Sequence, residues 1–203
     1  MKLYYSPGAC SLATHIVLEW VGKPYETQEV NIHAPKSPEL LEVNPAAAVP
    51  VIEDGGWVLT QNAAILNYLA DMNPDAKLGG DGSPKSRAEV NRWLGSVNSD
   101  VHPAFKPLFG AADYIGDEAA IEKVKDNSKK AIRKNLELAD KQLAGKDWIA
   151  GPRSIADPYL FVMLRWGRAL KVDLSGLGNL EKFFERMHSD AAVKKVLKAE
   201  GLG

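Results

Sequence analysis

The sequence of 203 residues contains a single cysteine, no long apolar run and no marked excess of charge of either sign. One cysteine excludes an internal disulfide, which is typical of a reducing compartment. No segment approaches the roughly 20 apolar residues of a membrane-spanning helix, and the N-terminus lacks the apolar stretch of a secretory signal. With 25 basic and 26 acidic residues, the net charge of −1 lacks the positive excess of nucleic-acid-binding proteins. We therefore expect a cytoplasmic globular protein that binds neither nucleic acid nor a membrane.

Charge and composition divide the chain near residue 80. Residues 1–80 carry 4 basic and 9 acidic side chains, a net charge of −5, whereas residues 81–203 carry 21 and 17, a net charge of +4. The segment 73–84 between them is rich in Gly, Pro and Asp, a composition typical of linkers. We predict two domains, residues 1–78 and residues 85–203.

The first domain combines strand and helix patterns. Runs of strand-forming residues predict four strands, at residues 2–5, 25–32, 49–53 and 57–60. Helical spacing and start signals predict three helices, which begin at Cys10, at Pro38 after the N-cap Ser37, and at Ala63. The resulting order, β-α-β-α-β-β-α, is that of a thioredoxin-like α/β domain.

The second domain contains only helical patterns. Apolar spacing predicts four helices, at residues 85–112, 118–143, 157–170 and 180–197. Ser154 and Asp157 have the spacing of a short capping box, in which each side chain accepts from the backbone N–H of the other, and we assign them a structural role. The fold class is therefore a thioredoxin-like N-terminal domain followed by an all-α C-terminal domain.

Cys10 lies at the start of the first predicted helix. Unpaired backbone N–H groups and the helix dipole favour a thiolate there, so we expect a pKa below the ~8.5 of a free cysteine. Disulfide oxidoreductases of this fold carry a second cysteine three residues on, but that position is Ala13, so any thiol partner comes from outside the chain. The alternative is that Cys10 is a small buried apolar side chain.

Two further segments have local signals for a ligand. A cis peptide bond at Val49-Pro50 would bring the strand end beside the cysteine and leave the Val49 backbone free to pair with an extended peptide, whereas a trans proline at a strand edge is the alternative. Gln61 and Asn62 precede a helix, where polar groups and free amides suit a carboxylate but also cap helices without any ligand.

The four histidines and the single cysteine have no metal-ligand spacing, so we expect no metal. His15 fits a structural role, and His33 and His188 show no local chemistry. His102 stands beside Pro103 in a helical pattern, and from this pattern alone it is a surface or packing residue.

Several motifs together resemble the cytosolic glutathione S-transferases, most closely the bacterial beta class. The resemblance covers essentially the whole chain and is carried by residues 1–12, Asn44-Pro45, Val49-Pro50, 59–65, 68–71, Trp93-Leu94, Val101-His102, 107–109, 155–157 and 200–202. It implies the glutathione S-transferase fold and a homodimer that binds glutathione as a co-substrate between its two domains.

The resemblance also implies roles for individual residues. Cys10 would lie beside the glutathione sulfur and form a mixed disulfide with it, and His102 and Ser11 would orient that sulfur. Val49, followed by Pro50, would contact the cysteinyl unit of glutathione, and Gln61 and Asn62 would bind its γ-glutamyl end. Lys36 would lie near the glycyl end. Ser99 would contact the ligand of the neighbouring subunit. The sequence departs from the class at Gln61-Asn62, Gly95, Pro103 and the run 46–48. Gln61 and Asn62 still supply hydrogen-bonding groups for the γ-glutamyl end, whereas Gly95 removes one cross-subunit contact.

Three hypotheses follow from these residues. The first is a glutathione transferase that acts on electrophilic, largely apolar small molecules, with a second-substrate pocket near Phe105, Phe109 and Trp166. The second is a glutathione-dependent thiol-disulfide reductase that works through a Cys10 mixed disulfide. The third is a non-catalytic ligand-binding member of the fold. In a dimer, the −5 and +4 halves would attract one another across the interface.

Overall fold

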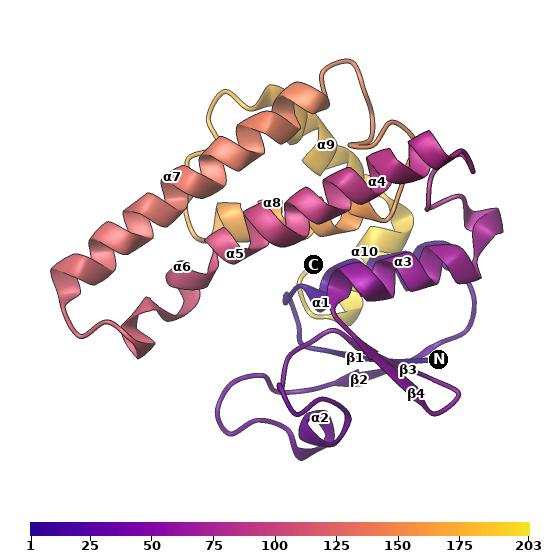
Figure 1. Cartoon of the computed structure of the whole chain (residues 1–203), viewed down its shortest axis with the longest axis horizontal. Coiled ribbons are helices and arrows are strands. Elements are labelled where there is room, and N and C mark those ends of the chain that lie inside the picture. The colour runs from indigo at the N-terminus through magenta and orange to yellow at the C-terminus, as the bar shows by residue number, and fades with distance from the viewer.

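The computed structural model describes residues 1–203. The first part of the chain is built around a four-stranded mixed sheet (Figure 1). The elements of this part are β1 (Lys2–Tyr5), α1 (Ser11–Val21), β2 (Glu26–Glu29), α2 (Pro38–Val43), β3 (Val51–Asp54), β4 (Trp57–Thr60) and α3 (Asn62–Met72). The strand order is β2-β1-β3-β4, with β1 parallel to β2 and antiparallel to β3, and β3 antiparallel to β4. The predicted thioredoxin-like order is confirmed.

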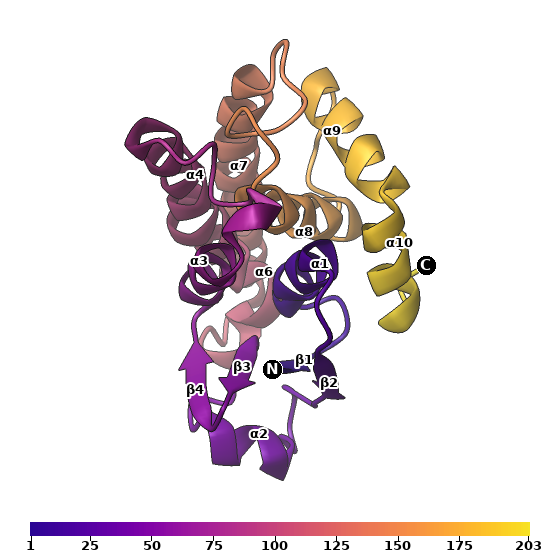
Figure 2. The same ribbon diagram turned by 90° about the vertical axis from the view of Figure 1, so that its right-hand side faces the viewer.

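Side-chain alternation along β1 determines which helices cover each face of the sheet. Leu3 and Tyr5 join the main hydrophobic cluster on the face covered by α1 and α3, whereas Tyr4 joins a smaller cluster with Leu40 of α2. Figure 2 shows α1 and α3 between the sheet and the later helices, with α2 on the opposite side. The sheet is therefore the central layer of the first domain.

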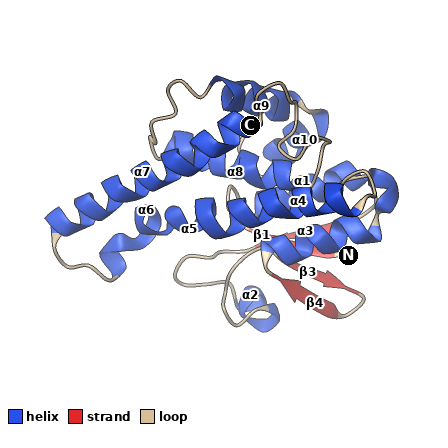
Figure 3. Cartoon of the chain, turned by 45° about the horizontal axis from the view of Figure 1, so that its top comes forward, coloured by secondary structure: helices blue, strands red, loops and turns tan.

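The second part of the chain is helical (Figure 3). Its helices are α4 (Pro84–Ser96), α5 (His102–Ala104), α6 (Lys106–Gly110), α7 (Glu118–Gln142), α8 (Ala156–Ala169), α9 (Gly178–Ser189) and α10 (Ala191–Ala199). The predicted all-α C-terminal domain is confirmed, and no helix has the length and apolarity needed to cross a membrane.

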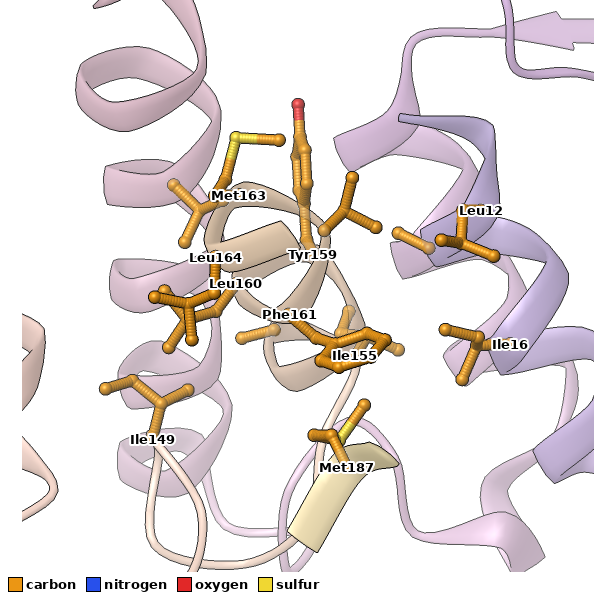
Figure 4. Packing of buried hydrophobic residues seen from close by; sticks show 14 of the residues in the cluster. Leu12, Ile16, Ile149, Ile155, Tyr159, Leu160, Phe161, Met163, Leu164 and Met187 are labelled. Atoms are coloured by element: carbon orange, nitrogen blue, oxygen red, sulfur yellow. The ribbon is translucent and has the colours of Figure 1, made fainter. Parts of the chain in front are cut away.

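Helix α8 lies at the centre of the helical part, and it joins this part to the first domain. In Figure 4, Leu12 and Ile16 of α1 lie opposite the start of α8, where Ile155 is the N-cap residue and Phe161 stands within the helix. These four side chains have no exposed surface and belong to one cluster of 42 buried residues that contains parts of both domains. The shared core fixes the position of the helices relative to the sheet.

Some predicted boundaries in the first domain were wrong. The strand predicted at 25–32 is limited to Glu26–Glu29, and the strand predicted at 49–53 begins at Val51 because Pro50 has no N–H to donate to a ladder. Ser37 does occupy the N-cap position of α2. Its hydroxyl, however, accepts from the Asn31 N–H at 2.7 Å and not from its own helix.

Two predicted helices are in fact interrupted. In place of one helix over 85–112, α4 passes into a π-helical turn at Val97–Val101 and then into the short helices α5 and α6. Pro103 and Pro107 lack the N–H groups that an uninterrupted α-helix needs at these positions. In place of one helix over 180–197, Asp190 separates α9 from α10 and caps α10 by accepting from the N–H groups of Ala192 and Val193.

The capping box before α8 contains one of its two predicted hydrogen bonds. Asp157 accepts from the Ser154 N–H at 2.7 Å, as expected. The reverse bond is different, because the Ser154 hydroxyl accepts from the Ala156 N–H and the Asp157 N–H donates to the Ser154 carbonyl. Asp157 also accepts from the Ile149 N–H, so it joins the loop before α8 to the helix.

Candidate active site

A cavity of about 840 Å³ lies where the sheet meets the segment from α4 to α6. Six of the predicted site residues line it, namely Cys10, Val49, Pro50, Gln61, Asn62 and His102. Five come from the first domain and one from the second. The structure therefore brings together residues that are up to 92 positions apart in the sequence.

Cys10 occupies the N-cap position of α1, directly after the turn that follows β1. Its thiol donates to the Val49 carbonyl at 3.2 Å. Burial raises the pKa of the Cys10 thiol to about 12 and outweighs the backbone N–H groups of Cys10 and Ser11, which act in the opposite direction. The expected lowering of the Cys10 pKa is therefore wrong, because desolvation exceeds the effect of the helix N-terminus.

The peptide bond between Val49 and Pro50 is cis, which the sequence analysis had left open. No hydrogen bond within the chain uses the Val49 N–H, whereas the Val49 carbonyl accepts from the Cys10 thiol. Directly before β3, the backbone of Val49 thus presents a free donor and an acceptor at the cavity. This is the pairing edge that an extended peptide requires.

Gln61 and Asn62 differ sharply in their surroundings. Gln61 has a left-handed backbone with φ of 73° and an exposed side chain. Asn62 is buried, and its amide accepts from the Thr14 hydroxyl at 2.8 Å and donates to the Cys10 carbonyl at 3.0 Å. The Asn62 side chain therefore supports the Cys10 turn, and its backbone is what remains available to a ligand.

His102 is half-buried at the start of α5. Its Nδ1 lies 2.6 Å from the Tyr159 hydroxyl, and its ring meets the Trp166 ring edge-on with centroids 5.0 Å apart. Burial lowers the pKa of His102, so the neutral imidazole is the favoured form at pH 7. His102 is thus fixed by tertiary contacts, although its local sequence pattern is that of a surface or packing residue.

Three predicted site residues do not line the cavity. Ser11 is buried, and its hydroxyl forms hydrogen bonds with the backbone of Ser6. Lys36 is exposed in the loop before α2, and Ser99 is exposed in the π-helical turn. By contrast, His33, whose local sequence shows no chemistry, lines the cavity.

The three aromatic residues expected near a second substrate do contact one another. The Trp166 ring lies 5.5 Å from that of Phe105 and 5.0 Å from that of Phe109. Phe105 has no exposed surface, and the Trp166 indole donates to the Gly8 carbonyl at 2.8 Å. Only Phe109, which is 57% exposed, lines the cavity.

Sequence reasoning missed several residues that line the cavity. They are Asn44, Asn98, Lys106, Asp113, Tyr114 and Tyr159. Tyr159 has no local signal, because it stands in a strongly apolar helix and fits a core residue. Asn98 has one local signal: it precedes His102 by four residues, which places both on one face of a helix.

Comparison with known proteins agrees with this arrangement. The family model described as "Glutathione S-transferase, N-terminal domain" matches residues 1–71, and "Glutathione S-transferase, C-terminal domain" matches residues 101–190. The chain is 51% identical over 203 residues to "Glutathione S-transferase GST-4.5" of Xanthomonas campestris pv. campestris, with both chains covered completely.

Solved structures give the same result. A glutathione S-transferase from Xylella fastidiosa is 48% identical with a TM-score of 0.95 and covers 100% of this chain and 99% of its own. A beta-class enzyme from Sphingomonas chungbukensis is 38% identical with a TM-score of 0.88, and a sphingomonad glutathione S-transferase complexed with glutathione is 36% identical with a TM-score of 0.86; both pairs are covered completely. In agreement with its resemblance to the bacterial beta class, the chain belongs to the glutathione S-transferase family and is a glutathione transferase.

Proposed function

We propose that this enzyme binds glutathione as its co-substrate in the cavity beside Cys10 and transfers it to electrophilic, largely apolar small molecules. The observation that carries the proposal is that the Cys10 thiol, the Val49 backbone and the His102 ring line one cavity of about 840 Å³. A tripeptide and a small second substrate both fit in a site of this size. The exposed ring of Phe109 supplies an apolar surface on the side of the second domain.

The proposed placement of glutathione follows the free groups of the cavity. Its cysteinyl unit pairs with the Val49 backbone, whose turn is fixed by Pro50. The γ-glutamyl end lies at the N-terminus of α3, held by Gln61 and the backbone of Asn62. The glycyl end lies toward the loop that carries Lys36 and His33. Residues 1–78 thus serve as the glutathione-binding domain, and residues 85–203 supply the second-substrate pocket.

Cys10 acts in this proposal as a hydrogen-bond donor to the glutathione sulfur. With a pKa of about 12, its thiol stays protonated at pH 7. When glutathione pairs with the Val49 backbone, the Cys10 S–H turns from the Val49 carbonyl to the glutathione sulfur and stabilises it as a thiolate. That thiolate attacks the electrophile, and the leaving group departs. No metal takes part in these steps.

We also propose an oligomeric state and a cellular location for the enzyme. We place the enzyme in the cytoplasm as a homodimer, without nucleic-acid or membrane partners. Exposed apolar side chains on both domains support a dimer, among them Trp57 at 50%, Met72 at 53% and Leu138 at 55%. Ser99, which is exposed away from its own cavity, is the residue we assign to the partner's ligand.

A thiol-disulfide reductase is the second candidate function. The specific observation in its favour is that Cys10, the only thiol of the chain, lines the cavity where it can meet the disulfide of a glutathione adduct. The raised pKa of Cys10 argues against it, because the thiolate is the nucleophile in disulfide exchange.

The experiment that tests both functions compares the wild type with Cys10→Ser and Cys10→Ala. The glutathione-dependent rate is measured with a reactive aryl chloride, and the reductase rate with a glutathione mixed disulfide. We expect Cys10→Ser, which keeps a donor, to retain conjugation within about tenfold, and Cys10→Ala to lose more. A wild type that reduces the disulfide but conjugates nothing would establish the reductase instead. Reductase turnover that survives in Cys10→Ser would exclude a mechanism through a Cys10 mixed disulfide.

A further inference from the structure

The hydroxyl of Tyr159 is a buried polar group to which the proposed chemistry assigns no role. The residue is 1% exposed, and its ring belongs to the hydrophobic cluster around α8. Figure 4 shows the Tyr159 hydroxyl pointing away from the labelled apolar side chains of this cluster. Tyr159 lines the cavity together with Cys10 and His102, so its hydroxyl lies at the site and not in the core.

Two groups lie within hydrogen-bond distance of this hydroxyl. His102 Nδ1 lies at 2.6 Å, and Asn98 Oδ1 lies at 3.3 Å and accepts from the hydroxyl. The hydroxyl has one proton and can also accept, whereas the carbonyl oxygen of Asn98 can only accept. If Tyr159 donates to Asn98, then His102 must carry its proton on Nδ1 and donate it to the Tyr159 oxygen. With the amide oxygen of Asn98 toward Tyr159, this is the single assignment in which both contacts are hydrogen bonds.

We propose that Tyr159 and Asn98 are positioning residues that hold His102 in the tautomer protonated on Nδ1, with Nε2 free to take the proton of the glutathione thiol. The proposal rests on the proposed function of the cavity. In the step it describes, the S–H bond of glutathione breaks and an Nε2–H bond forms. The imidazolium keeps its Nδ1 proton, which donates a hydrogen bond to the Tyr159 oxygen, and it releases the Nε2 proton to solvent after the thiolate has attacked.

The surroundings of His102 suit this role. No hydrogen bond within the chain uses its Nε2, and no carboxylate forms an ion pair with the ring. Besides His102, the titratable groups that line the same cavity are Cys10, His33, Tyr114 and Tyr159, and the charged ones are Lys106 and Asp113. Burial lowers the pKa of His102 and raises that of Tyr159, so both groups are neutral at pH 7. His102 therefore still donates to Tyr159, and Tyr159 to Asn98, at this pH.

The kinetic test uses Tyr159→Phe and Asn98→Leu, each of which removes one hydrogen-bonding group at similar size. We expect kcat/KM for conjugation to fall about tenfold at pH 6.5, and the deficit to shrink above about pH 9, where the thiol of glutathione ionises without a base. Phe161→Leu is the control, because it disturbs the packing of the same helix without touching the hydrogen bonds. A loss that is the same at every pH, as a packing defect gives, would overturn the proposal.

A double-mutant cycle separates positioning from other effects. In the His102→Gln background, Tyr159→Phe should cause no further loss of kcat/KM, because the group that it positions is already absent. Losses that add fully would show that Tyr159 acts independently of His102 and would contradict the proposal.

A measurement without substrate keeps this inference distinct from the proposed function. Nitrogen-15 NMR of the free enzyme reports the tautomer of each of its four histidines. We expect His102 to be protonated on Nδ1 in the wild type and to lose this preference in both Tyr159→Phe and Asn98→Leu. Protonation on Nε2 in the wild type overturns the inference whatever the activity, whereas an Nδ1 proton in an enzyme that conjugates nothing refutes only the proposed function.

Discussion

At Cys10 two effects act on the same thiol in opposite directions. The N-terminus of α1 favours the thiolate, and removal of the sulfur from water favours the thiol. Desolvation is the larger effect, since the pKa rises to about 12. The Val49 carbonyl reinforces this result, because it accepts a hydrogen bond that only the protonated sulfur can donate.

This balance predicts how Cys10 reacts in the free enzyme. A raised pKa means that the thiolate fraction at pH 7 is very small and grows about tenfold per pH unit until the pH reaches the pKa. We expect the rate of alkylation by iodoacetamide to rise in this way from pH 7 to pH 10 without a plateau. A plateau below pH 8 would show that the helix N-terminus is the stronger effect after all.

Phe105 and Phe109 make a second prediction at this scale, because they differ in exposure. Phe105→Ala should cost about 3–5 kcal/mol of the free energy of unfolding, since the ring is fully buried. Phe109→Ala should cost less than about 1 kcal/mol but raise KM for an aryl electrophile about five- to tenfold, since an aromatic contact contributes on the order of 1 kcal/mol. Urea unfolding and steady-state kinetics measure the two effects, and an unchanged KM in Phe109→Ala would remove this ring from the second-substrate pocket.

At the scale of elements, the segment from α4 to α6 shapes the cavity wall. The π-helical turn and the two prolines end the regular helix, and Asn98, His102 and Phe109 all line the same cavity. In an uninterrupted α-helix these residues would share one face, but residue 109 would lie about 16 Å further along the axis than residue 98.

The start of α8 depends on Asp157, which is fully buried and accepts from the N–H groups of Ile149 and Ser154. Asp157→Ala leaves both donors buried without a partner, so we expect a loss of about 3 kcal/mol, measured by urea unfolding. Asp157→Asn keeps one acceptor oxygen and should cost less. Equal stability of Asp157→Ala and the wild type would contradict this assignment.

The same variant should show a pH dependence. Burial raises the pKa of Asp157 to about 7, above the roughly 3.9 of the unfolded chain. The folded state therefore holds this proton more tightly, and the stability that Asp157 contributes is complete below about pH 4 and declines as the pH rises through 7. The difference between the wild type and Asp157→Ala should be larger at pH 5 than at pH 8.

At the scale of the whole molecule, the C-terminal tail holds the turn before Cys10. Glu200 accepts from the Gly8 N–H at 3.0 Å and pairs with His15 at 2.8 Å, and both the carboxylate and the imidazole are buried. Glu200→Ala should cost about 1–3 kcal/mol, because it leaves the buried His15 ring and the Gly8 N–H without their acceptor. Glu185→Ala, on the exposed side of α9, is the matched control and should change little. If both variants have the same midpoint of urea unfolding as the wild type, the C-terminal tail does not support the turn before Cys10.

The proposed dimer gives the last prediction. The −5 and +4 halves attract one another if they meet across the interface, and this attraction is screened as the Debye length falls from about 10 Å in 0.1 M salt to about 3 Å in 1 M. Sedimentation velocity should therefore show a weaker dimer in 1 M NaCl. A dimer that is equally tight at both salt concentrations would remove charge as the cause.

The sequence by itself determined the order of strands and helices, the position of Cys10 before α1, and the proline that precedes β3. These features depend on local backbone rules: apolar period, missing N–H groups and start signals for helices. Such rules act over a few residues and can be read along the chain. The same rules did not predict the interruptions of the helices expected at 85–112 and 180–197, because the apolar period of the sequence continues through both breaks.

Only the tertiary structure decided the chemistry of the cavity. It raised the pKa of Cys10, paired Tyr159 with His102 across 57 positions, and turned the Ser11 hydroxyl toward Ser6. It also buried Phe105 and exposed Phe109, which stand four residues apart and share one helical pattern. The physical reason is that desolvation and long-range hydrogen bonds depend on which surfaces meet in space, and this is absent from the spacing of residues along the chain.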